Sequence, residues 1–113
     1  MGYDIYFTDR IRTVLTSLKV PYTEKKMMGG LLFMVNNSMC VNADQDKNTG
    51  EDRLMVRVGK ENYDTLLLEK GARKMDFTGR AMNGFLFIYP EGTESNEQLH
   101  FWIQKALAYN KTL

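Results

Sequence analysis

Apolar residues in the first segment of the chain recur with the period of an α-helix. Within residues 3–19 they fall at three- and four-residue spacing, at Phe7, Ile11, Val14, Leu15 and Leu18. This spacing places them on one side of a helix, where they can be buried together. Pro21 cannot continue a helix, so the first helix is predicted to end before it.

Two further helices are indicated by their end signals. Residues 61–70 form a short helical pattern, and Gly71 stands where helices often stop. In the last segment, Ser95 and Gln98 have the spacing of a capping box, which opens a helix. The apolar stripe of this last helix consists of Leu99, Trp102, Ile103, Ala106 and Leu107.

Six short segments between these helices have the pattern of β-strands. They are residues 22–28, 31–35, 39–43, 53–58, 73–78 and 85–89. Asn36 and Asn37 tolerate positive φ angles, so they predict a two-residue turn between the second and third strands. The last two strands are expected to form a hairpin joined through residues 79–84, and residues 43–52 are expected to form a polar loop.

The order of these elements is α-β-β-β-β-α-β-β-α. No long crossover joins successive strands, so the sheet is expected to be mainly antiparallel. We therefore expect residues 1–113 to form a single α+β domain. It should have a curved sheet of about six strands and carry three helices.

Two adjacent glycines, Gly29 and Gly30, precede a long apolar run, LLFMV. Glycine adopts backbone angles denied to other residues, so the pair is interpreted as a tight bend between two strands. A phosphate-binding loop is the alternative. It is rejected because such loops open onto a helix N-terminus, whereas a strand follows here.

The hairpin after the glycines is apolar on both faces. A two-residue turn places Met34 opposite Met39, Leu32 opposite Val41, and Phe33 opposite Cys40. A sheet with one solvated face should alternate apolar and polar residues, and this hairpin does not. We therefore expect part of each face to be covered, by a helix of this chain or by a partner subunit.

Composition indicates a soluble cytoplasmic protein. The chain is 43% hydrophobic and 26% charged with a net charge of +1, so no overall basic field points to nucleic acid or to an anionic membrane. Charged residues near the N-terminus exclude an apolar signal segment, and no apolar stretch is long enough to span a bilayer.

No residue pattern indicates catalysis, a cofactor or a metal. His100 is the single histidine and has no second metal ligand at useful spacing, and Cys40 lies within a strand with no activating base nearby. The loop that begins at Asp44 resembles a calcium loop, but Thr49 and Met55 occupy the positions where glycine and glutamate are required. We expect neither an enzyme nor a metal site.

The segment KKMMGG, followed by LLFMVNNSM, resembles the signature of the TfoX N-terminal domain family, the Sxy-type competence regulators. The family pattern reads basic residue, any residue, Met, Phe, Gly, Gly, then strand, turn and strand. The residues that match it are Lys25, Met27, Gly29 and Gly30. Met28 stands where phenylalanine is usual, and the tripeptide YPE at 89–91 and the helix FWIQKAL at 101–107 also fit.

The resemblance implies a compact α+β fold similar to the YjbR group and a bacterial protein. The best-known members regulate DNA-uptake genes and have no described active site. Those members carry a second, C-terminal helical domain, whereas this sequence ends at Leu113. A stand-alone N-terminal domain is therefore expected, and the missing half puts the transcriptional role in doubt.

The expected function is that of a non-enzymatic regulatory or protein-interaction domain, with a protein partner that could be a second copy of the chain. The alternative is direct nucleic-acid binding through a basic strand face. The surface residues for either role are Lys25, Lys26, Arg53, Met55, Arg57, Arg73 and Arg80. Convergence of these residues requires the first, fourth and fifth strands to lie near each other. The alternative is a solvated strand face whose charges keep the sheet edge from pairing with another strand.

Overall fold

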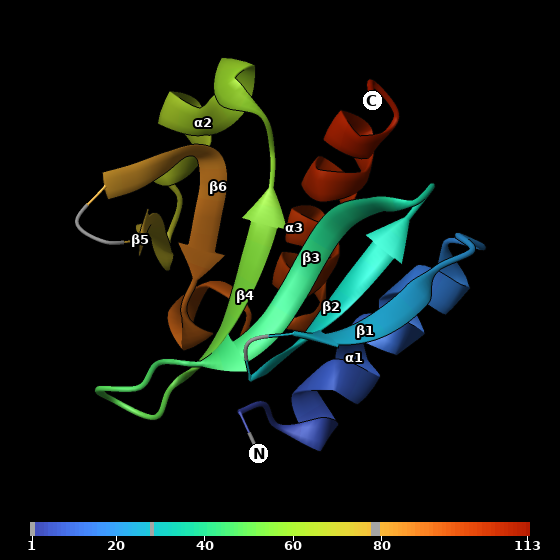
Figure 1. Cartoon of the computed structure of the whole chain (residues 1–113), viewed down its shortest axis with the longest axis horizontal. Helices are drawn as coiled ribbons and strands as arrows, with labels where there is room; N and C mark the ends of the chain where they lie inside the picture. Colours follow the sequence, from blue (N-terminus) through green and yellow to red (C-terminus); the bar gives the residue numbers. More distant parts are fainter. Residues whose placement is uncertain (1, 28, 78–79) are drawn as a thin grey trace.

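Six antiparallel strands form one sheet in the order β1-β2-β3-β4-β6-β5 (Figure 1). The computed structural model describes residues 2–27, 29–77 and 80–113, and the side chains of residues 76, 77, 80 and 81 lie outside that description. In chain order the elements are α1 (Ile5–Ser17), β1 (Thr23–Met27), β2 (Gly30–Val35), β3 (Ser38–Gln45), β4 (Asp52–Arg57), α2 (Lys60–Leu67), β5 (Ala72–Phe77), β6 (Arg80–Ile88), the short 3-10 helix η1 (Pro90–Gly92) and α3 (Asn96–Asn110). This order confirms the predicted α+β class.

The helices pack on one side of the sheet. α1 and α3 contact each other behind the strands in Figure 1, and α3 also packs on β3 and β4. Trp102 and Ile103 of α3 and Ile11 of α1 are fully buried in the main core, where they meet the inward side chains of the strands. These are apolar positions from the helical stripes in the sequence, so the stripes mark the buried faces correctly.

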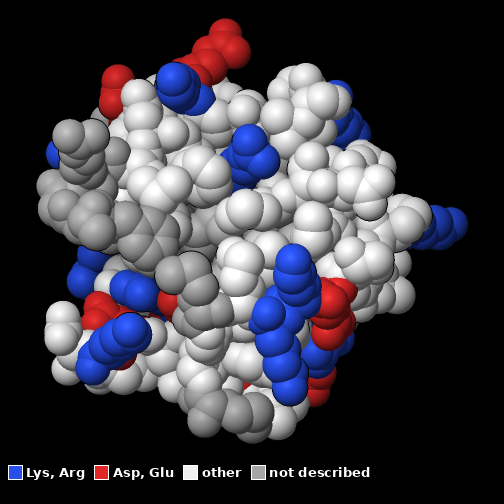
Figure 2. Space-filling view, in the orientation of Figure 1, with Lys and Arg blue, Asp and Glu red and all other residues white. Residues whose placement is uncertain are grey.

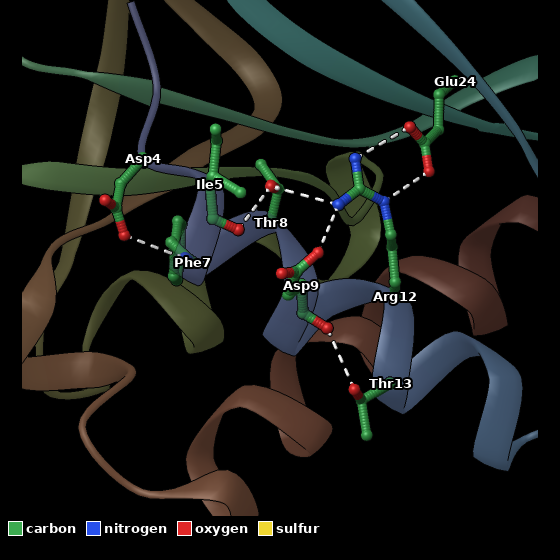
Figure 3. Close-up of polar contacts among 8 residues, drawn as sticks. All are labelled: Asp4, Ile5, Phe7, Thr8, Asp9, Arg12, Thr13 and Glu24. Carbon is green, nitrogen blue, oxygen red and sulfur yellow. Dashed lines mark hydrogen bonds and ion pairs between the residues drawn. The ribbon is translucent and has the colours of Figure 1, made fainter.

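Two polar contacts fix the position of α1 (Figure 3). The Asp4 carboxylate accepts a hydrogen bond from the backbone N–H of Phe7 at 2.9 Å and so caps the first turn. Arg12 donates two hydrogen bonds to the Glu24 carboxylate, through Nε at 2.6 Å and Nη2 at 2.9 Å, and also contacts Asp9. The Arg12–Glu24 pair ties the helix to the edge strand β1.

The two glycines before β2 have different structural roles. Gly29 has a positive φ of 81°, which favours glycine, and its missing Cβ would meet nothing within 4 Å. At Gly30 a Cβ would lie 2.8 Å from the carbonyl oxygen of Ala43 and 2.9 Å from the amide nitrogen of Asn42. Gly29 therefore makes the bend, and Gly30 lets β2 lie close to β3.

The predicted register of the β2–β3 hairpin is correct at the turn and wrong beyond it. Asn36 and Asn37 have φ angles of 53° and 63°, and Met34 lies opposite Met39 as expected. The register then shifts, so that Phe33 pairs with Val41 and not with Cys40. The other shifted pairs are Leu32 with Asn42 and Leu31 with Ala43.

The register shift is a β-bulge with Cys40 as the extra residue of β3. Both Cys40 and Val41 belong to the main core, so two consecutive residues of β3 are buried with the helices. A hairpin of uniform register would instead have placed Val41 on the same face as Leu32. The bulge thus brings Val41 and Ala43 to the helix side.

The last hairpin also differs from the prediction. β6 begins at Arg80, so residues 80–84, which were expected in a loop, belong to the strand. The connection through residues 78 and 79 lies outside the described residues. α2 ends at Leu67 and not at residue 70, and the capping box between Ser95 and Gln98 is present as predicted.

Candidate functional site

The sheet face opposite the helices is lined by methionine and aromatic side chains. Its apolar residues, which we call the open face, are Met27, Leu32, Met34, Met39, Met55, Met75, Met82, Phe85, Phe87 and Tyr89. None of these residues belongs to a helix, and they form a cluster separate from the main core. Figure 2 shows this side of the molecule as mostly uncharged where it is described, with lysine and arginine side chains at several points and aspartate and glutamate side chains near some of them.

The open face is only partly protected from solvent. Leu32 and Met55 are each 2% exposed, so they form the floor of the face. Met27, Met34, Met39, Met82 and Phe85 remain half-buried. The helices thus cover one face, which confirms half of the prediction, but no described helix residue contributes to the apolar cluster on the other face. Over the described part of the other face, the strands' own side chains give the protection.

Three arginines lie over aromatic rings on or beside this face. The Arg53 guanidinium carbon is 3.8 Å from the ring centroid of Phe87, and that of Arg73 is 3.9 Å from the ring of Tyr89. Arg57 lies 5.5 Å from the ring centroids of both Phe85 and Tyr109. Such cation–π contacts hold the charged groups at the rim of the apolar floor.

Arg53 belongs to a polar cluster that holds the loop between β3 and β4. It donates to both oxygens of Asp44, at 2.8 and 3.2 Å, and to the Tyr89 hydroxyl at 3.2 Å. Tyr89 in turn donates a short hydrogen bond to Asp46, and this bond is the largest cause that lowers the pKa of Asp46. Burial, together with the same bond, raises the pKa of Tyr89. The cluster thus keeps a neutral phenol against an ionised carboxylate, an arrangement that fixes the loop.

The same contacts engage the carboxylates of the loop that resembles a calcium loop. Both oxygens of Asp44 accept hydrogen bonds from Arg53, and Asp46 accepts from Tyr89 and from the backbone N–H of Asn48. Throughout the described residues, no three His, Cys, Asp or Glu side chains are grouped so that they could hold a metal ion.

The predicted surface residues fall on different parts of the sheet. Arg53, Met55 and Arg57 share one face of β4, as the alternation indicated, and Arg73 pairs with Phe87 on that face from β5. Lys25 and Lys26 lie on β1, at the opposite edge of the strand order. The structure therefore brings together the arginines of β4 and β5 but does not place the lysines beside them.

Lys25 and Lys26 point to different sides of the sheet. Lys25 pairs with Leu32 of the open face, whereas Lys26 pairs with Leu31 of the main core. The Arg80 side chain lies outside the described residues. Lys25 is thus the lysine of β1 that shares a face with Arg57 and Arg73.

Met55 contributes to the site differently from the sequence-based expectation. It was predicted to be part of a contact surface. The structure buries Met55, which is 2% exposed, in the floor of the open face. The exposed apolar surface is formed by other methionines.

Sequence reasoning missed the aromatic part of the open face. Phe85, Phe87 and Tyr89 alternate with Leu86 and Ile88, which point to the main core. The motif FLFIY therefore contained the signal, because alternate residues of a strand line opposite faces.

Neither of the two candidate nucleophiles or bases has a catalytic setting in the described residues. Cys40 is 1% exposed, and burial raises the pKa of its thiol to about 12, so the reactive thiolate is disfavoured. His100 is half-buried and lines a groove between α1 and α3 whose other residues include Asp9, Arg10 and Asn96. Among the described residues, no hydrogen bond or ion pair orients its imidazole as a base.

No helix within the described residues has the length and apolar character needed to cross a membrane.

Comparison with known proteins assigns a family. The curated proteins contain no match to the sequence. The model of the TfoX N-terminal domain matches residues 14–109, a range that includes the glycine bend, the whole sheet and nearly all of α3. The chain therefore belongs to the TfoX N-terminal domain family.

Proposed function

We propose that the chain is a non-enzymatic regulatory domain that acts by binding another protein through the open face. The observation that supports this most is the half-buried layer of methionines on the side of the sheet that lacks helices. Methionine side chains are flexible and polarizable, so they adapt to the shape of a partner. The resemblance to competence regulators supports the regulatory part of the proposal.

Charge complementarity indicates the chemistry of the partner. Asp44 and Asp46 share the single positive charge of Arg53, and the negative charge that remains is held in the loop cluster with Tyr89. In the described part of the chain, by contrast, neither Lys25 nor Arg57 has an ion pair with a carboxylate. The proposed partner presents apolar side chains flanked by acidic residues, which would face the methionines and the free cations.

Nucleic-acid binding is less well supported by the geometry. Sequence-independent binding of single strands uses aromatic rings on which bases stack. Here Phe87 and Tyr89 are buried, at 8% and 5% exposed, and the guanidinium carbons of Arg53 and Arg73 lie within 3.8 and 3.9 Å of their ring centroids. A protein partner is therefore preferred, and nucleic acid becomes an outcome of the test.

The test compares capture of partners by the wild-type chain and by a variant with a charge on the open face. Met39→Asp places a carboxylate on the half-buried methionine layer, so we expect it to abolish capture of a specific protein from native cell extract. Gln104→Asp introduces the same charge on the exposed side of α3 and should leave capture unchanged. Mass spectrometry identifies the proteins that depend on Met39.

A parallel capture after nuclease treatment separates the two kinds of partner. A protein that survives nuclease and is lost only with Met39→Asp supports the proposal, most strongly if its contacting segment is apolar and acidic. Capture that is insensitive to Met39→Asp contradicts it. Capture that nuclease removes, together with retention on heparin by the wild type, favours the nucleic-acid alternative.

A further inference from the structure

A small cavity lies where β4 leads into α2, beside β6 and the last turn of α3. It has a volume of about 370 Å³, and its side-chain walls come from Arg57, Lys60, Asn83, Phe85 and Tyr109. In Figure 1 these elements meet at the end of the β4 arrow, near the C-terminus. Its volume lies within the range of small-molecule sites.

Close backbone packing creates this cavity. The N–H groups of Val58 and Gly59 both donate to the carbonyl oxygen of Gly84, at 2.9 and 3.1 Å. Gly59 has a positive φ of 83°, and a Cβ on it would lie 2.5 Å from the ring of Tyr109. The ring therefore lies directly on bare backbone, which holds α3 against the start of α2.

The cavity is cationic and has aromatic walls. The Arg57 guanidinium carbon lies 5.5 Å from the ring centroids of both Phe85 and Tyr109. Lys60 adds a second positive charge, and none of the described residues that line the cavity is acidic. An arginine held by two rings loses less side-chain freedom when it binds an anion.

Comparison with Arg53 on the same strand shows what is unusual about Arg57. Arg53 already has two carboxylates as partners, Asp44 and Asp46, so its charge is used within the molecule. Among the described residues, Arg57 has no such partner. Its guanidinium remains available for an external carboxylate.

We propose that this cavity binds a small organic carboxylate that carries a flat apolar group. The carboxylate accepts hydrogen bonds from Arg57 and Lys60, and the apolar group packs against Phe85 and Tyr109. A planar guanidinium matches the geometry of a carboxylate, and the rings favour an organic acid over a fully hydrated inorganic anion. This site shares Arg57 and Phe85 with the proposed protein-binding surface, but its test requires no protein partner.

The test uses benzoate as the probe and benzamide as its uncharged counterpart, at constant ionic strength. In a ¹⁵N-resolved NMR titration, benzoate should shift the backbone amide signals of Gly59, Lys60 and Gly84 in a saturable manner. Benzamide, which lacks the charge, should not. Inorganic phosphate, which lacks the ring, should bind at least about tenfold more weakly than benzoate, as expected when stacking on the two rings is lost.

Three variants locate the site. Arg57→Met should weaken benzoate binding by at least about tenfold, because a hydrogen bond to a charged group is lost. Lys60→Met should weaken it to a smaller extent, and it also tests the site if Arg57→Met does not fold. Lys105→Met removes a cation that lies over the Phe101 ring elsewhere on α3, so it should leave binding unchanged.

The proposal would be overturned by any of three results. The first is a benzoate titration that does not saturate or that benzamide reproduces. The second is wild-type affinity in both Arg57→Met and Lys60→Met. The third is equal affinity for phosphate and benzoate, because the rings would then have no part in recognition. Failure to capture a protein on the open face would leave each of these results unaffected.

Discussion

Gly29 and Gly30 show how two identical neighbours in a sequence can be required for different reasons. Gly29 is required for its positive φ angle and has free space around it, whereas Gly30 is required because a Cβ there would collide with β3. Alanine at Gly29 costs only the strain of a left-handed conformation. At Gly30 it pushes β2 away from the backbone of β3.

This difference gives a prediction for the family motif. Gly29→Ala should lower the free energy of unfolding by about 1 kcal/mol through backbone strain. Gly30→Ala should lower it by about 2 to 3 kcal/mol, because added volume must be accommodated by backbone shifts. Gly50→Ala is the matched control for Gly29, since Gly50 has a φ of 77° and a Cβ there would also meet nothing. Urea unfolding of the three variants measures these values, and an equal cost at Gly29 and Gly30 would contradict the division of roles.

The residue scale also decides which basic side chains are available for binding. Arg53 and Arg57 look alike in the sequence, because they lie four residues apart on the same face of one strand. Their partners separate them: two aspartates surround Arg53, and two rings surround Arg57. Those partners come from other strands and from α3, so no local pattern could have distinguished the two arginines.

At the scale of elements, local signals predicted the elements well and their long-range pairing less well. The helix stripes, the Asn36-Asn37 turn and the capping box at Ser95 are encoded by neighbouring residues, and all three are confirmed. The pairing of β4 with β6 joins segments separated by α2 and β5. The order of strands, and with it the separation of the lysines of β1 from the arginines, could not be derived from local alternation.

The bulge at Cys40 illustrates the same limit within one hairpin. A two-residue turn fixes the pairs next to it, and Met34 with Met39 follows. The insertion of Cys40 is imposed from outside the hairpin, because the helices bury both Cys40 and Val41. The only local trace is that Met39, Cys40 and Val41 are apolar in succession and do not alternate with polar residues.

The contact between α1 and β1 should make stability depend on pH. The hydrogen bonds from Arg12 are the largest cause of the lowered pKa of Glu24. Because the pKa of Glu24 is lower in the folded state, the Arg12–Glu24 pair contributes fully to the free energy of unfolding above the unfolded-state pKa of about 4.3. This contribution is lost as the pH falls through the folded-state pKa of Glu24. Arg12→Met should therefore cost about 0.5 kcal/mol at neutral pH, since the pair is partly exposed, and nearly nothing in acid.

Urea unfolding of the wild type and of Arg12→Met at neutral and acidic pH checks this expectation. Glu24→Gln removes the titrating group, so its difference from the wild type should shrink over the same pH range. Lys26→Met is the control on β1, because Lys26 has no ion pair within the described residues. A cost of Arg12→Met that stays constant from neutral to acidic pH would show that packing of the arginine stem, and not the ion pair, supports α1.

At the scale of the whole molecule, the sheet separates two apolar layers that differ in what they contribute. The layer under the helices contains the largest buried side chains, among them Trp102, Phe33 and Ile103. The open face is made of strand residues and of Tyr89, and much of its methionine surface is half-buried. The proposed function requires that residues of the open face can be substituted without unfolding the domain, while the layer under the helices maintains the fold.

This requirement can be measured directly. Ile103→Ala leaves a cavity in the fully buried layer and should cost about 3 kcal/mol, a large part of the stability of a small domain. Met39→Ala on the open face should cost about 1 kcal/mol, because solvent already reaches this side chain and can fill the space that is vacated. Thermal and urea unfolding of both variants provides the comparison. The slope of the free energy of unfolding against urea concentration should remain unchanged. If Met39→Ala proved as damaging as Ile103→Ala, the open face would be a second core, and the loss of a partner in Met39→Asp could no longer be assigned to a binding surface.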